Sequence, residues 1–155
     1  MAYKSLGTFS WGSGPVITGT FYYDKSRSGT SMKYKIKIVI DPVTGSSYFG
    51  YPIRTKIYLD GTKKASATLK DVSPNRWSDP IVYETSWITV SNKTSGTTSL
   101  IINLYSDSGS TRDTDYKKSL EVDPATSAIG KVSAFNIGDT IKVGIILEFT
   151  TVVRV

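Results

Sequence analysis

"KYKIKIVI", residues 33–40, alternates lysine with apolar side chains over most of its length. In an extended strand, Tyr34, Ile36, Ile38 and Ile40 would share one face, and the three lysines would lie on the other. An α-helix, with 3.6 residues per turn, would scatter the same apolar residues around its circumference. One buried face and one wetted face are typical of a strand in an antiparallel sheet.

The same alternation recurs in three other stretches, 53–59, 99–105 and 141–149. The inward faces that it predicts consist of Ile53, Thr55, Ile57 and Leu59; Leu100, Ile102 and Leu104; and Ile141, Val143, Ile145, Leu147 and Phe149. No segment keeps the apolar period of an amphipathic helix, and residues 122–131 could supply one short turn at most. The sequence therefore predicts an all-β chain with almost no helix.

Turn residues separate these stretches at regular intervals. Asp60-Gly61 predicts a two-residue hairpin, because both residues tolerate the positive φ that such a turn needs. Residues 92–96 and 107–115 predict longer turns. The prolines fall in predicted loops or near strand ends, where a missing backbone donor is harmless: Pro15, Pro42, Pro52, Pro74, Pro80 and Pro124. Seven to nine short strands favour an antiparallel two-sheet sandwich, immunoglobulin-like or jelly-roll-like, over a barrel.

The length of the chain, 155 residues, suits one core of ordinary size. We expect a β-sandwich domain over 1–124, followed over 125–155 by a linker and a strand-rich tail. Two strands alone are marginally stable in water. The tail is therefore predicted to pack on the same sandwich or, alternatively, on a neighbouring subunit.

The chain has no cysteine and no histidine. Disulfides, thiolate ligands and imidazole general bases are thus all excluded. The aspartates are scattered over separate predicted turns, which does not predict a catalytic carboxylate pair. The acidic loop 107–115 also lacks the ligand spacing of a calcium loop. We expect no enzymatic activity, no cofactor and no metal site, with a two-carboxylate hydrolase as the remaining enzymatic alternative.

The net charge is +6, which favours anionic partners in general. The basic residues are nevertheless spread along the chain, and Arg54, Lys56 and Tyr58 interleave cations with an aromatic ring over one short stretch. Nucleic-acid binding is therefore not expected. The most apolar stretch, 141–155, is short and interrupted by charges, so membrane insertion is not expected either.

Aromatic side chains are the main resource for ligand binding, because exposed ring faces can stack on sugar rings. Trp77 lies in a predicted loop between two prolines, Trp11 lies between glycines, and Tyr22-Tyr23 lies at a predicted strand end. The candidate ligand-binding residues are Trp77, Trp11, Tyr22, Tyr23 and Tyr58. Trp87, at the start of a strand-like run, is assigned to the core.

Three stretches carry a resemblance to a known family: "IYLDGTKKASATL" (57–69), "WITVSNKTSGTTSLIINLYSDSGS" (87–110) and "KSLEVDPATSAIGKVSAFNIGDTIKV" (118–143). Their order of hairpin, polar turn, Ser/Gly-rich loop and Pro-Ala-Ser-type linker resembles the repeated immunoglobulin-like sandwich modules of siphophage minor structural and tail proteins. The match covers the latter two-thirds of the chain and consists of strand and turn patterns.

The resemblance implies a non-enzymatic protein of a phage virion, associated with the tail, the tail tip or a fibre. Such a protein would be made in the cytoplasm of the bacterial host and would assemble with itself or with other virion proteins. It would also be placed to contact cell-wall polysaccharide or other glycans of the host surface. A carbohydrate-binding module or lectin outside any virion is the alternative that the aromatic residues leave open.

Overall fold

Two antiparallel β-sheets pack face to face in the computed structural model, which describes residues 2–12, 15–107 and 113–125. The described residues form nine strands and no helix. The chain divides into one unit over Met1–Asp123 and a second over Pro124–Val155. Of the second unit only Pro124 and Ala125 are described, so the predicted linker and the strand 141–149 lie outside the described residues.

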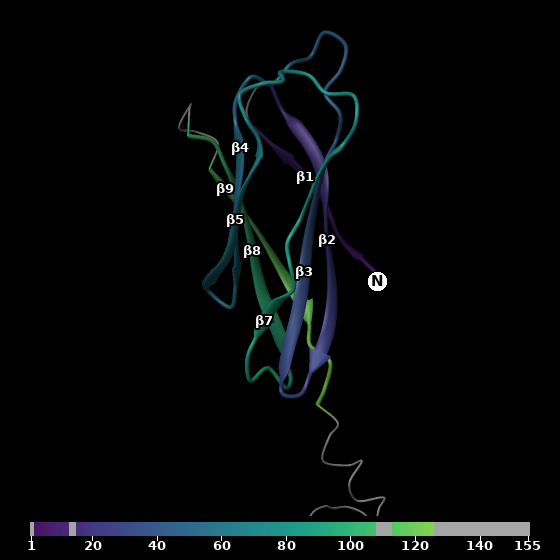
Figure 1. Ribbon diagram of the computed structural model, residues 1–155, viewed down its shortest axis with the longest axis vertical. Coiled ribbons are helices and arrows are strands. Elements are labelled where there is room, and N and C mark those ends of the chain that lie inside the picture. Colours follow the sequence, from purple (N-terminus) through teal and green to yellow (C-terminus); the bar gives the residue numbers. More distant parts are fainter. Residues whose placement is uncertain (1, 13–14, 108–112, 126–155) are drawn as a thin grey trace, which may run out of the picture. The chain divides into compact units, whose positions relative to one another are not determined.

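The first sheet has the order β1-β2-β3-β6, and β7 also pairs with β3 (Figure 1). Its strands are β1 (Lys4–Trp11), β2 (Ile17–Ser28), β3 (Ser31–Ile40), β6 (Ile81–Glu84) and β7 (Ile88–Val90). The second sheet has the order β5-β4-β8-β9. Its strands are β4 (Ile53–Leu59), β5 (Thr62–Lys70), β8 (Thr97–Tyr105) and β9 (Thr114–Glu121). The predicted antiparallel two-sheet sandwich is therefore confirmed.

The hairpin between β4 and β5 turns at the predicted residues. Asp60 has a φ of 47° and Gly61 has a φ of 81°, and the flanking Leu59 and Thr62 are paired. Positive φ at both central residues matches the twist of the turn to that of the strands. The turn before β8 likewise uses Asn92, with a φ of 53°.

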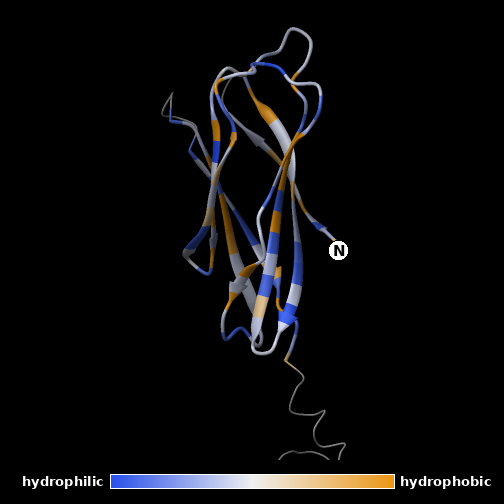
Figure 2. Cartoon of the chain, viewed as in Figure 1, coloured by the Kyte–Doolittle hydropathy of each residue, from blue (hydrophilic) through white to orange (hydrophobic). Residues whose placement is uncertain are grey.

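The core lies between the inward faces of the two sheets. All four alternating residues predicted in 33–40 are completely buried, as are Ile57, Leu100, Ile102 and Leu104. Figure 2 shows the corresponding alternation of apolar and hydrophilic residues along β3. The period-two pattern therefore predicted both the strands and the faces that they bury.

An aromatic cluster in the core depends on a glycine in β2. Phe9 stacks on Phe21 with ring centroids 4.3 Å apart, and Phe9 lies directly opposite Gly19 across the β1–β2 pair. A Cβ atom at Gly19 would lie 2.6 Å from the Phe9 ring and 2.2 Å from the carbonyl oxygen of Val39. The missing side chain of Gly19 thus makes the space into which the Phe9 ring packs.

Candidate ligand-binding site

Two long loops meet at one end of the sandwich, 41–52 between β3 and β4 and 71–80 between β5 and β6 (Figure 1). The amide of Val43 donates to the carbonyl of Trp77 at 2.9 Å, and the amide of Trp77 donates back at 3.0 Å. A further backbone bond links the Phe49 amide to the Asn75 carbonyl at 2.8 Å. These backbone hydrogen bonds therefore hold the two loops against each other.

Lys70, the last residue of β5, is buried beneath these loops with 5 % of its surface exposed. Its ammonium donates to the carbonyls of Tyr51, at 3.0 Å, of Val72, at 3.2 Å, and of Asp71. Burial lowers the pKa of the Lys70 amine below its ordinary value. The three carbonyl oxygens replace the water that the ammonium has lost, so Lys70 fastens both loops to the end of β5.

Trp77, the first of the candidate ligand-binding residues, is half-buried in this loop pair. Its indole N–H donates to the carbonyl of Asp41 at 3.0 Å, and the Lys70 ammonium lies 5.5 Å from its ring centroid. The loop position predicted from the sequence is correct. The indole is, however, engaged in holding the loop pair together.

Trp11 and Tyr23 point into the core, whereas a ligand-binding ring would have to face solvent. Trp11 is 1 % exposed and packs against Phe49, while Tyr23 is 4 % exposed and lies beside Tyr34. Both occupy inward positions of their strands, because the period of two places every second residue between the sheets. Neither ring face can meet a ligand while the sandwich is closed.

Tyr22 lies on the outer face of the first sheet, where aromatic rings and lysines alternate. The ammonium of Lys37, its partner across β2 and β3, is 5.4 Å from the Tyr22 ring and 4.2 Å from the Tyr3 ring. Tyr58 is half-buried on the outer face of the second sheet, since its neighbours Ile57 and Leu59 face inward. The five candidates are thus not brought together.

The assignment of Trp87 to the core is wrong. Trp87 is 38 % exposed, and the Lys35 ammonium lies 5.6 Å from its ring centroid on the outer face of the first sheet. It immediately precedes β7, in which Ile88 and Val90 take the inward positions at 8 % exposure each. Because alternate residues face opposite sides, the position next to Ile88 points outward.

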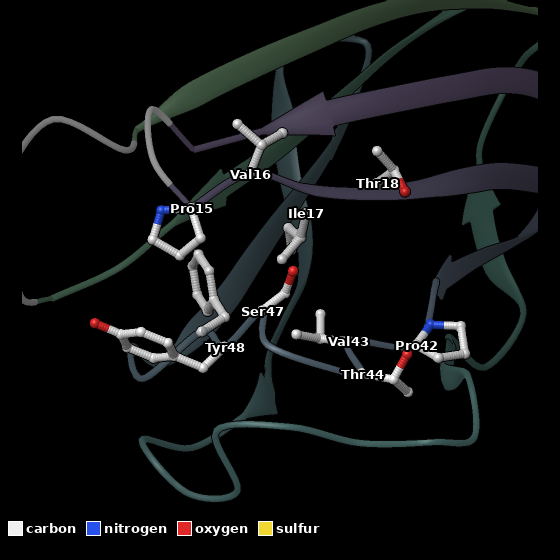
Figure 3. A pocket seen from close by; sticks show the side chains of 10 residues that line it. Pro15, Val16, Ile17, Thr18, Pro42, Val43, Thr44, Ser47 and Tyr48 are labelled. Atoms are coloured by element: carbon white, nitrogen blue, oxygen red, sulfur yellow. The ribbon is translucent and has the colours of Figure 1, made fainter.

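A hollow opens at the same end of the sandwich, between the start of β2 and the loop that follows β3 (Figure 3). Its volume is about 440 Å³. It is lined by Pro15, Val16, Ile17, Thr18, Pro42, Val43, Thr44, Ser47, Tyr48 and Phe49. In Figure 3, Pro15 and Tyr48 lie at one end of the hollow and Pro42 and Thr44 at the other, with Ile17 and Ser47 between them.

The lining combines exposed apolar side chains with hydroxyl groups. Tyr48 is 56 % exposed and Val16 is 51 % exposed, although both are large and apolar. The hydroxyl of Thr18 donates to the Asp41 carboxylate at 2.6 Å, beside the hollow. Such a surface offers a ring face and hydrogen-bonding groups to a small polar ligand. Neither Val16 nor Tyr48 was among the residues selected from the sequence, where Tyr48 is one aromatic residue in a Gly/Ser-rich loop.

The acidic side chains described near residues 107–115 bind neighbouring protein groups. Arg54 pairs with Asp107 at 2.5 Å, and the side-chain amide of Asn103 donates to Asp113 and Asp115. Within the described part of the chain, no group of three or more potential metal-ligating residues is placed to hold an ion. Residues 108–112 of this loop lie outside the described residues.

No helix among the described residues is long and apolar enough to cross a membrane.

No protein-family model, no curated protein and no solved structure matches this chain.

Proposed function

We propose that the chain is a non-enzymatic structural protein of a phage virion, associated with the tail, the tail tip or a fibre. It assembles with itself or with other virion proteins, and its loops contact glycans of the host surface. The resemblance of residues 57–69, 87–110 and 118–143 to immunoglobulin-like modules of siphophage tail proteins supports the virion assignment. Two different kinds of contact lie at opposite ends of the sandwich. This placement is the observation that supports the adhesive role.

At one end, charged side chains hold the last residue of the sandwich unit. Lys25 pairs with the Asp123 carboxylate at 2.5 Å, and the guanidinium of Arg27 donates to the Asp123 carbonyl. Arg27 also donates to the carbonyl of Lys93 at 2.8 Å, and Tyr34 donates to the carbonyl of Glu121 at 2.9 Å. The chain therefore leaves the sandwich from a fixed point beside the β2–β3 turn.

The hollow lies at the other end of the same two strands. Ile17 begins β2 and Ile40 ends β3, whereas Ser28 and Ser31 flank the turn near Asp123. A module that is tethered at its exit point would thus present the hollow and the paired loops away from the tether. This layout suits attachment to an assembly at one end and recognition of a ligand at the other.

The virion assignment is tested by fractionating lysates of the organism that carries the coding region after phage induction. We expect the protein to co-sediment with phage particles in a density gradient and to remain attached after high-salt washing. Detection of the protein only in the soluble fraction, with intact particles present elsewhere in the gradient, would contradict the assignment.

The hollow also favours a second function, that of a carbohydrate-binding module outside any virion. Its exposed Tyr48 and its hydroxyl groups do not require attachment to an assembly. Sugar binding by the purified chain together with its absence from particles would favour this second function.

A further inference from the structure

We propose that the hollow between the start of β2 and the loop after β3 is a binding site for an uncharged saccharide. Tyr48 supplies the stacking face, and Thr18, Asp41 and Ser47 supply hydrogen bonds to the sugar hydroxyls. The inference deepens the proposed adhesive function and depends on it for its biological setting, since it names the class of glycan and the residues that recognise it.

The size of the hollow fits a small ligand. Its volume of about 440 Å³ lies within the range of roughly 300–1,000 Å³ that is common for small-molecule sites. It is open to solvent and lies at the end of the sandwich, so an end or a branch of a polysaccharide can enter it without strand separation (Figure 3).

The apolar part of the lining is exposed to solvent, and a bound ligand would cover it. Val16 and Tyr48 are each more than half exposed, and both belong to the same concave surface. Pro15 and Pro42 extend that surface with rigid rings. The apolar C–H face of a pyranose ring would cover Tyr48 and remove this area from water.

Polar groups in the lining, and Asp41 beside it, can form hydrogen bonds with the hydroxyl groups of a sugar. One oxygen of the Asp41 carboxylate accepts the Thr18 hydroxyl at 2.6 Å, which orients both groups. A carboxylate has about four lone-pair sites, so Asp41 retains the capacity to accept a ligand O–H group. The exposed hydroxyls of Thr44 and Ser47 can both donate and accept.

The loop that carries Tyr48 is held in place before any ligand arrives. Arg76 donates through Nε to the carbonyl of Ser47 at 2.8 Å, and Phe49 donates through its amide to the carbonyl of Asn75. The paired amides and carbonyls of Val43 and Trp77 hold the other side of the loop. Little loop ordering is then required on binding, which favours affinity for a small ligand.

The lining of the hollow offers no charged partner to an anionic glycan. The lining residues carry no charged side chain; Asp41 bonds to Thr18 beside them, and Arg76 donates to the carbonyl of Ser47. A phosphate or carboxylate group would therefore find no cation among the lining residues, and the charges of Asp41 and Arg76 nearby are of opposite sign. Neutral hexoses and N-acetylhexosamines present the required combination of an apolar ring face and hydroxyl groups.

The test uses the full chain labelled with ¹⁵N and titrated with neutral oligosaccharides of glucose, galactose, mannose and N-acetylglucosamine. At least one of them should bind and shift the amide resonances of Thr18, Thr44, Ser47 and Tyr48. Tyr48→Ala should weaken that binding by about tenfold or more, and Thr18→Val should weaken it as well. The matched control is Tyr58→Ala, which removes a half-buried tyrosine from the outer face of the second sheet.

Four results would overturn the proposal. The first is the absence of binding by every neutral oligosaccharide up to millimolar concentrations. The second is a set of resonance shifts confined to the outer sheet faces, and the third is equal affinity of the Tyr48→Ala and Tyr58→Ala variants. The fourth is preferential binding of anionic oligosaccharides. Absence of the protein from phage particles would instead refute the virion assignment and leave sugar binding in the hollow unaffected.

Discussion

At the scale of single residues, Lys70 does the most to define the loop-bearing end of the sandwich. A buried ammonium is unfavourable unless polar groups solvate it, and here the carbonyls of Tyr51, Asp71 and Val72 do so. Those carbonyls belong to both long loops, so one side chain connects segments that are about twenty residues apart in sequence. The rings of Phe49 and Trp77, with centroids 5.9 Å and 5.5 Å from the ammonium, cover the same group.

Replacing Lys70 with methionine should destabilise the protein by about 1–3 kcal/mol, because three partly buried carbonyls lose their donor while the apolar stem is retained. Chemical denaturation monitored by tryptophan fluorescence measures the change. Lys64→Met, at an exposed position of the same strand, is the control and should leave the midpoint almost unchanged. An unchanged or raised midpoint for Lys70→Met would show that the ammonium does not stabilise the loops.

At the scale of elements, the β4–β5 hairpin shows how a turn residue also connects strands. The Asp60 carboxylate accepts the Lys93 ammonium at 2.9 Å through Oδ2 and the Ser99 amide at 2.9 Å through Oδ1. Burial acts to raise the pKa of Asp60, but the hydrogen bonds from Lys93 and Ser99 outweigh it and lower that pKa below its ordinary value. Asp60 thus fastens the hairpin to β8 and to the turn that precedes it.

Because the pKa of Asp60 is lower in the folded state, its contribution to stability is present above the unfolded-state pKa of about 3.9. That contribution is lost as the pH falls through the folded-state value. Asp60→Asn should therefore flatten the fall in unfolding free energy between about pH 5 and pH 2, while asparagine still tolerates the positive φ. Urea unfolding at a series of pH values measures the slope. Identical slopes for the variant and the wild-type chain would contradict the role assigned to Asp60.

At the scale of the whole molecule, the unit Met1–Asp123 has a core of its own and two ends that differ in their contacts. Lys25 and Arg27 secure the exit of the chain, and the hollow lies where the same β2–β3 pair ends. The net charge of +6 is spread over the chain rather than concentrated at the hollow. In the function that we propose, attachment and recognition would use different chemistry as well as different ends.

A chain ending at Ala125 should fold cooperatively, because every described strand and every buried apolar residue named in the core precedes that position. Thermal melting by circular dichroism should give one β-rich transition. Light scattering on both chain lengths tests whether residues 126–155 pair with a neighbouring subunit. If they do, truncation lowers the measured mass of the assembly. Loss of the cooperative transition on truncation would show that the tail completes the sandwich.

The sequence by itself determined the strands around 33–40, 53–59 and 99–105, their inward faces and the Asp60-Gly61 turn. These follow from local rules, since side chains alternate with a period of two and few residues accept positive φ. The same rule, applied from Ile88, would also have placed Trp87 outward. The assignment failed because it relied on residue type, which favours burial of tryptophan, over position.

Only the tertiary structure decided which loops meet and where the hollow opens. The hollow depends on contacts between Thr18 and Asp41 and between Val43 and Trp77, and the loops depend on Lys70. The partners in these contacts lie far apart in sequence and share no period or motif, so no local sequence pattern predicts the contacts. They become neighbours because two sheets pack on one core and bring their connecting loops to a common end.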